Sequence, residues 1–215
     1  MYKKKPYFIV FEGVEGCGKS YQSQKLKKNL KKKGINSILT REPGGTKSAE
    51  SIRTLILKDY FHKDKKEKFD KYTDTLLYLA ARNEHIKDKI LPALKKKEIV
   101  ICDRFIDSTL AYQIYGKKVN RSFIDHIHKF ILQGIKPNIT FVLKVSMKSS
   151  RLRLKKRKTT NRYDNFPQSF YKKAQKSFLK IAKNKKNYFI LDSSINDNNL
   201  ENKIFKIVSR NLKIK

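Results

Sequence analysis

The stretch FEGVEGCGKS, residues 11–20, decides how this chain is built. It matches the pattern G-x-x-x-x-G-K-[ST], in which Gly13, Gly18, Lys19 and Ser20 occupy the required positions. The glycines let consecutive backbone N–H groups point at a phosphate, and a following helix adds its N-terminal dipole. Lys19 is expected to reach the β- and γ-phosphates, and Ser20 to ligate Mg²⁺. An apolar run precedes the stretch and a helical pattern follows it, which favours a nucleoside triphosphate site over an ordinary glycine-rich turn.

The composition is that of one globular domain. The chain has 215 residues, 39% of them apolar, and no apolar run approaches the roughly 20 residues that a membrane helix needs. The basic N-terminus leads straight into the predicted first strand and does not resemble a signal peptide, so we expect a cytoplasmic protein. The two cysteines, Cys17 and Cys102, form no C-x-x-C pair, which indicates neither a zinc site nor a disulfide framework.

The net charge of +33 raises the question of nucleic-acid binding. The positive charge is mostly lysine and is spread along the whole chain, together with abundant asparagine and isoleucine. This joint bias is typical of an AT-rich genome. We therefore expect no dedicated nucleic-acid site, and only weak binding to polyanions at low salt.

Apolar runs rich in β-branched residues alternate with helical periodicity. The runs predict strands at 7–11, 37–40, 99–102, 139–145 and 188–191. The periodic segments predict helices at 20–33, 48–57, 73–97, 109–115, 122–132, 148–156, 169–183 and 200–211. The alternation predicts an α/β fold with a parallel five-stranded sheet, helices on both faces and a ligand beyond the carboxyl ends of the strands. We expect one domain, residues 1–215, with a basic lid at about 151–165.

Two further motifs place charged residues at the ends of predicted strands. In IVICDRF, residues 99–105, Asp103 emerges where it can hold Mg²⁺ opposite Ser20, and Arg104 follows it; a structural Asp–Arg pair is the alternative. In TREPGGT, residues 40–46, Arg41 reaches the same edge, and guanidinium groups suit phosphate capture. A hydrolase needs only the triphosphate site, so two arginines beside it indicate a phosphate acceptor and hence a kinase.

The motifs FEGVEGCGKS, TREPGGT, LYLAARNEH, DRFIDSTLAYQ and RYD follow one another in an order and spacing that resembles the thymidylate kinase family. The resemblance covers essentially the whole chain, and TREPGG followed by DR-x-x-x-S-T-x-A-Y-Q is its most specific part. It implies the P-loop fold of nucleoside-monophosphate kinases, ATP and Mg²⁺ as cofactors, phosphorylation of dTMP to dTDP, and a homodimer.

Carried over by position, the resemblance implies three groups of site residues. The ATP phosphates would be held by Gly13, Val14, Glu15, Gly16, Cys17, Gly18, Lys19 and Ser20. The dTMP pocket would consist of Glu15 at the sugar, Arg41 and Arg104 at the phosphate, Tyr78 stacked on thymine, Arg82 reaching the base, and Thr109, Tyr112 and Gln113. The metal region would be served by Ser20, Asp103 and Glu12. Tyr78 and Arg82 share a helix face at i, i+4 spacing, and the alternative for them is a half-buried aromatic with a surface arginine.

The lid is expected to supply an arginine because the phosphate loop contains none, as in the bacterial-type members of this family. Arg157 is favoured, with Arg153 and Arg162 in support, so the catalytic set comprises Lys19, Asp103, Arg104 and Arg157. Two positions depart from the family pattern. Asn161 stands where an aspartate is common, and Lys144 stands where an acid commonly ends the fourth strand.

Two other functions remain open at this point. One is a kinase for a different nucleotide, against which Tyr78, Arg82 and the segment 109–113 argue. The other is a basic, nucleic-acid-binding ATPase, which would leave TREPGG and DRFIDS without a purpose.

Overall fold

Five parallel strands form the centre of the computed structural model, which describes residues 5–57, 69–157, 163, 166–195 and 197–214. The order across the sheet is β2-β3-β1-β4-β5, so the first strand lies in the middle and the sheet grows from it in both directions. The bounds are β1 Tyr7–Glu12, β2 Ser37–Arg41, β3 Ile99–Asp103, β4 Ile139–Lys144 and β5 Tyr188–Asp192. Each strand was therefore predicted to within one residue at both ends.

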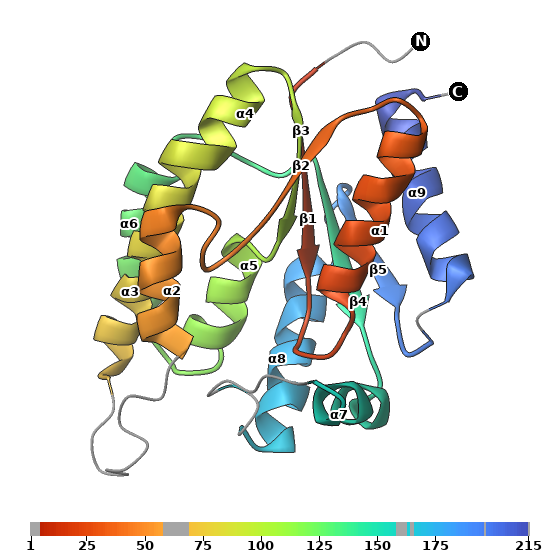
Figure 1. Ribbon diagram of the computed structural model, residues 1–215. Coiled ribbons are helices and arrows are strands. Elements are labelled where there is room, and N and C mark those ends of the chain that lie inside the picture. The colour runs from red at the N-terminus through yellow and green to blue at the C-terminus, as the bar shows by residue number, and fades with distance from the viewer. Residues whose placement is uncertain (1–4, 58–68, 158–162, 164–165, 196, 215) are drawn as a thin grey trace.

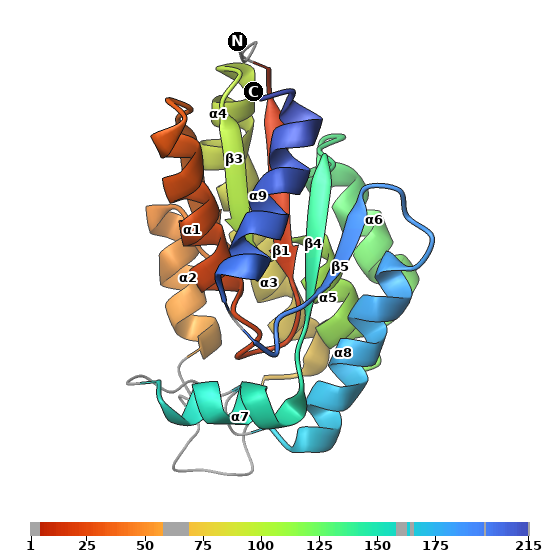
Figure 2. The same ribbon diagram turned by 90° about the vertical axis from the view of Figure 1, so that its right-hand side faces the viewer.

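Helices cover both faces of the sheet (Figures 1 and 2). One face carries α1 (Lys19–Lys32) and α9 (Asn198–Leu212). The other carries α3 (Lys71–His85), α4 (Leu91–Lys95), α5 (Ile106–Thr109) and α8 (Gln168–Ala182), with α2 (Lys47–Leu57) and α6 (Arg121–Ile131) packed outside α3. Helix α7 (Met147–Lys155) crosses below the carboxyl ends of the strands in Figure 2. Among the described helices, none has both the length and the apolar character needed to cross a bilayer.

The central strand is buried along its whole length because both of its faces are covered. Its side chains alternate between two cores: Ile9 and Phe11 join one apolar cluster, and Phe8 and Val10 join the other. This continuous apolar run explains why the first strand carries the hydrophobic signal that precedes the phosphate loop. Cys102 belongs to the second cluster and is fully buried.

Two helices differ from their predicted form. The helix predicted at 73–97 is continuous but contains a π-turn, Ile86–Ile90, between α3 and α4. Pro92 follows this turn and has no N–H to donate, so the regular hydrogen-bond ladder is interrupted there. The helix predicted at 109–115 begins three residues earlier, as α5, and continues into a second π-turn, Leu110–Ile114.

Parallel strands bring their carboxyl ends to one edge, and the register decides which residues meet there. Asp103 ends β3 and pairs with Phe11 on one side and with Arg41 on the other. The phosphate loop, the acid of IVICDRF and the arginine of TREPGGT therefore share one edge of the sheet, as the sequence predicts. Within the predicted lid, residues 158–162 and 164–165 lie outside the described part of the chain. The first of these ranges includes Asn161 and Arg162.

Candidate active site

The phosphate loop joins β1 to α1 and closes around the amine of Lys19. This side chain is only 6% exposed, and its Nζ donates to the carbonyl oxygens of Gly13 (3.1 Å) and Val14 (2.9 Å). No carboxylate of the described residues lies within ion-pair distance of Nζ. Val14 and Cys17 bury their side chains in the core while their backbone forms the loop. The ammonium group of Lys19 can therefore pair with an anion that binds in the loop.

Helix α7 supports the loop from outside. Ser150 Oγ donates to the carbonyl oxygen of Glu15 at 2.8 Å, and Arg153 donates to that of Gly16 at 3.2 Å. A second nitrogen of Arg153 donates to the carbonyls of Ser193 and Ser194, after β5. Arg153 was expected to support a catalytic arginine of the lid. Its guanidinium is instead bonded to three backbone carbonyls, so it ties α7 and the loop after β5 to the phosphate loop.

Gly16 is the point at which α7 comes closest to the loop. Its φ is +70°, and a Cβ there would lie 2.7 Å from the carbonyl oxygen of Ser150. Gly34 has the same φ of +70° with nothing within 4 Å of its hypothetical Cβ. The two glycines therefore share the backbone strain that a side chain would add and differ only in the clash.

Gly16→Ala is expected to lower kcat/KM for ATP by more than tenfold, because the loop or α7 must move to admit the methyl group. Gly34→Ala should keep wild-type kinetics. It should lower only the free energy of unfolding, by about 1–2 kcal/mol, because a residue with a side chain is strained in the left-handed conformation. Steady-state kinetics and thermal unfolding of both variants check this. Equal activity of the two variants would show that contact with α7 does not shape the loop.

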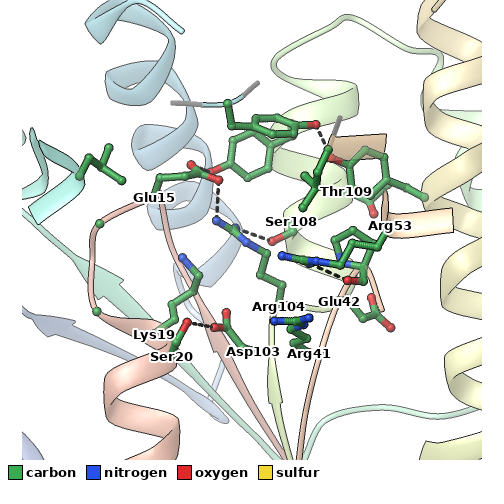
Figure 3. Close-up of a pocket in the computed structure, with 18 of the residues that line it drawn as sticks. Glu15, Lys19, Ser20, Arg41, Glu42, Arg53, Asp103, Arg104, Ser108 and Thr109 are labelled. Atoms are coloured by element: carbon green, nitrogen blue, oxygen red, sulfur yellow. Dashed lines mark hydrogen bonds and ion pairs between the residues drawn. The ribbon is translucent and has the colours of Figure 1, made fainter. Parts of the chain in front are cut away.

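The metal side of the site brings Ser20 and Asp103 together. Ser20 Oγ donates to Asp103 Oδ2 at 2.5 Å, which joins the first turn of α1 to the end of β3 (Figure 3). Hydroxyl and carboxylate oxygens are the donors that Mg²⁺ takes. No group of three acidic, histidine or cysteine side chains among the described residues could hold a metal alone. This fits Mg²⁺, which keeps waters and substrate phosphates among its ligands.

Glu12 does not join this metal region. It is fully buried, does not line the cavity, and accepts from Phe105 N (2.8 Å), Ser108 N (3.2 Å) and Ser108 Oγ (2.6 Å). Burial and then the nearby charge of Asp107 raise the pKa of Glu12 to about 8. The carboxyl group holds the start of α5, at Phe105 and Ser108, directly after Arg104. The expected metal role is therefore not supported, because the carboxylate faces the start of α5 and not Ser20.

Arg104 lies at the centre of the cavity. Its φ of +73° is unusual for a residue with a side chain, and it aims the guanidinium back at the phosphate loop. There it donates to Gly13 O (3.0 Å), Ser108 Oγ (3.0 Å) and Glu15 Oε1 (2.7 Å). Tyr112 donates to the other oxygen of Glu15 at 2.6 Å. Burial alone would raise the pKa of Glu15, but Arg104 and Lys19 outweigh it and keep that pKa lowered.

Two more arginines line the same cavity. Arg41 pairs with Glu50 (Nη2 to Oε2, 2.9 Å) and remains half-exposed. Arg53 lies one turn after Glu50 on α2 and donates to the carbonyl oxygen of Pro43 at 2.6 Å. Arg53 was not predicted as a site residue. Its i, i+3 spacing from Glu50 on a helix directly after TREPGGT is the signal that could have identified it.

The far end of the cavity is aromatic. The hydroxyl groups of Tyr78 and Tyr163 hydrogen-bond to each other, and Tyr163 lies against Tyr112. Gln113 is 2% exposed and lines the cavity, and its amide nitrogen finds no hydrogen-bond partner among the described residues. A buried, unused donor is costly in a protein unless a ligand completes it. Tyr163 belongs to the RYD motif, in which only Arg162 was predicted to have a role.

Arg82 is neither a surface residue nor free to move. It is 3% exposed and bonded to Glu42, Thr109, His128 and the carbonyl oxygen of Phe105. Burial would raise the pKa of Glu42, but Arg82 is the first of several partners that lower it. Arg82 lines the cavity together with Thr109, and its guanidinium is held there by a buried network.

Most of these groups line one cavity of about 460 Å³, within the range of small-molecule sites. Figure 3 shows Ser20 hydrogen-bonded to Asp103, and Arg104 reaching toward Glu15. Of the predicted residues, the lining includes Glu15, Gly16, Gly18, Lys19, Ser20, Arg41, Tyr78, Arg82, Asp103, Arg104, Thr109, Tyr112, Gln113, Arg153 and Arg157. Gly13, Val14 and Cys17 complete the loop beneath it, and Glu12 lies apart.

Comparison with known proteins agrees with this geometry. The family model described as thymidylate kinase matches residues 11–204. A thymidylate kinase of a Wolbachia species from Brugia malayi is 44% identical over 82% of each chain, and that of onion yellows phytoplasma is 40% identical over 96% of each. The crystal structure of thymidylate kinase from Ehrlichia chaffeensis superposes with a TM-score of 0.72 at 32% identity, covering 95% of this chain and 99% of that one. With its fold, its cavity and these relatives in agreement, this chain belongs to the thymidylate kinase family.

Proposed function

We propose that this chain transfers the γ-phosphate of ATP to dTMP, giving dTDP. The observation that carries the proposal is the presence of two cationic sites in one cavity: Lys19 in the phosphate loop and the arginines Arg41, Arg53 and Arg104 beside it. A hydrolase would need only the first. The second provides guanidinium groups for the phosphate of an acceptor.

The donor nucleotide would lie with its phosphates on residues 13–20, where the backbone N–H groups and Lys19 neutralise them. Ser20 and Asp103 would hold Mg²⁺, which supplies charge neutralisation at the transferring phosphoryl group. Arg157, which lines the cavity from the lid side, would meet the charge that develops during transfer. Phosphoryl transfer depends mostly on positioning and electrostatic stabilisation, and these residues provide both.

The phosphate of the acceptor would lie at Arg104 and Arg41, and its sugar at Glu15. Its base would lie between Tyr78 and Tyr112. Arg104 already occupies a fixed position, because Glu15 and Gly13 hold its guanidinium. The unused amide donor of Gln113 and the hydroxyl of Thr109 border the base end, where polar edges of a pyrimidine would need partners.

We propose that the whole chain acts as one kinase domain in the cytoplasm, with the lid at 151–165.

Transfer of label from [γ-³²P]ATP tests the reaction. We expect labelled dTDP only when dTMP and Mg²⁺ are both present, and none after chelation of the metal with EDTA. Label released mainly as inorganic phosphate without an acceptor, and more of it with added DNA, would contradict the proposal and favour a nucleic-acid-dependent ATPase.

We also propose that the chain forms a homodimer, as the family resemblance implies. Helix α3 leaves Tyr72 and Leu76 exposed, at 36% and 47%, on the side of the sheet where α2 and α6 form an outer layer (Figure 1). Exposed apolar side chains one helical turn apart are the kind of surface that a second copy covers. Sedimentation velocity at micromolar concentration would show a mass near 51 kDa, about twice the 25.3 kDa of one chain.

A further inference from the structure

A neutral histidine lies directly behind Arg82, at the base end of the cavity. His128 comes from α6 and is 5% exposed. Its Nε2 lies 2.8 Å from a terminal nitrogen of Arg82, and the same nitrogen donates to Thr109 Oγ1 at 2.8 Å. Helix α6 carries none of the motifs by which this family is recognised, so nothing in the sequence pattern assigns His128 a role.

The chemistry of the pair determines the proton on the ring. A guanidinium group has only donors, so Nε2 of His128 must accept and its proton must reside on Nδ1. Burial and the Arg82 charge lower the pKa of His128 to about 3, which agrees with a neutral ring. His128 is therefore a fixed acceptor for Arg82.

Among the described residues, the contacts of Arg82 use four of its donors and leave one. A guanidinium has five N–H groups. Glu42, Thr109, His128 and the carbonyl oxygen of Phe105 each take one of them, at 2.7 to 2.9 Å. The fifth N–H is on the nitrogen that donates to Phe105. Because four contacts on different sides fix the plane of the group, the direction of the fifth donor is fixed as well.

We propose that His128 is a positioning residue for the acceptor base: it holds Arg82 so that its one remaining N–H faces the cavity. The proposal rests on the placement of the base beside Arg82 given above. Without the His128 acceptor, one N–H on the adjacent nitrogen is buried without a partner, and the guanidinium must turn to satisfy it. The direction of the fifth N–H of Arg82 then changes. This N–H no longer donates to a carbonyl oxygen of the base.

The test is a set of variants with kinetics for each substrate. We expect His128→Ala to raise KM for dTMP about tenfold, the scale of one misplaced hydrogen bond, with KM for ATP changed less than about twofold. His128→Gln should restore KM, because the amide oxygen can take the place of Nε2 as acceptor. His126→Ala is the matched control, since this exposed histidine lies on the same helix and packs edge-on against Phe130. It should behave as wild type.

A purely structural role would give a different pattern. His128→Ala would then lower the unfolding temperature and the active fraction while KM for dTMP stayed at the wild-type value, and that result would overturn the proposal. Kinetics of Tyr78→Ala distinguish a refuted role of His128 from a wrong placement of the acceptor base. If Tyr78→Ala raises KM for dTMP and His128→Ala does not, the map stands and the role of His128 is refuted. If neither variant changes KM, the base does not lie at this end and both proposals fall.

Discussion

Lys19→Ala is expected to lower kcat by at least about 10²–10³-fold, the loss that follows removal of one preorganised charge partner of a transition state. The amine is 6% exposed and held inside the phosphate loop by two carbonyl oxygens, where the β- and γ-phosphates are expected to bind. No neighbouring lysine can replace it, because α1 directs its other lysines toward solvent or toward Glu201.

Lys28→Ala provides the control for this experiment. Lys28 lies on the same helix, is exposed and does not line the cavity, so its loss should leave kcat within about twofold of wild type. Circular dichroism of both variants verifies that α1 is intact. Turnover of Lys19→Ala within a few-fold of wild type would remove the loop from the mechanism.

Arg104→Ala is expected to lower kcat/KM for dTMP by about 10²–10³-fold, with a much smaller change in KM for ATP. The substitution removes the guanidinium assigned to the acceptor phosphate and leaves the partly buried carboxylate of Glu15 without its ion-pair partner. Arg104→Lys keeps the charge but loses the forked geometry, so it should recover only part of the activity. Steady-state kinetics with each substrate varied in turn measures both.

The matched comparison is Arg151→Ala. Arg151 begins the predicted lid, is exposed on α7 and does not line the cavity. Its loss should therefore cost far less than that of Arg104. The reverse order, with Arg151→Ala the more damaged enzyme, would contradict the acceptor-site map.

The fold was predictable because its signals are local. An apolar run buried on both faces, such as Tyr7–Glu12, indicates a strand from composition alone, and the residues after each run then share one edge of a parallel sheet. Asp103 and Arg41 meet at that edge for this reason. The boundaries of 73–97 and 109–115 were less accurate, since π-turns depend on how a helix adapts to Pro92 or to its neighbours, and periodicity does not report them.

The parts of the site that escaped prediction depend on contacts distant in sequence. Glu12 was expected at the metal because it precedes the phosphate loop, but backbone N–H groups more than 90 residues away, at Phe105 and Ser108, take its carboxylate. Arg82 was expected at the base or on the surface, and His128, 46 residues later, makes it part of a buried network. Both pairings join segments far apart in the chain, and hydrophobic periodicity and local motifs do not report such contacts.

The most direct test of the central claim is acceptor specificity in a coupled ADP-release assay with Mg²⁺–ATP and a panel of dTMP, dUMP, dCMP, dGMP, AMP and UMP. We predict a strong preference for dTMP, because the cavity pairs a phosphate site at Arg104 with an aromatic, hydrogen-bonding end at Tyr78, Arg82 and Gln113. A preference for another monophosphate would keep the fold and the transfer mechanism but contradict the base site. ADP release that needs no acceptor and rises with DNA would contradict the kinase itself.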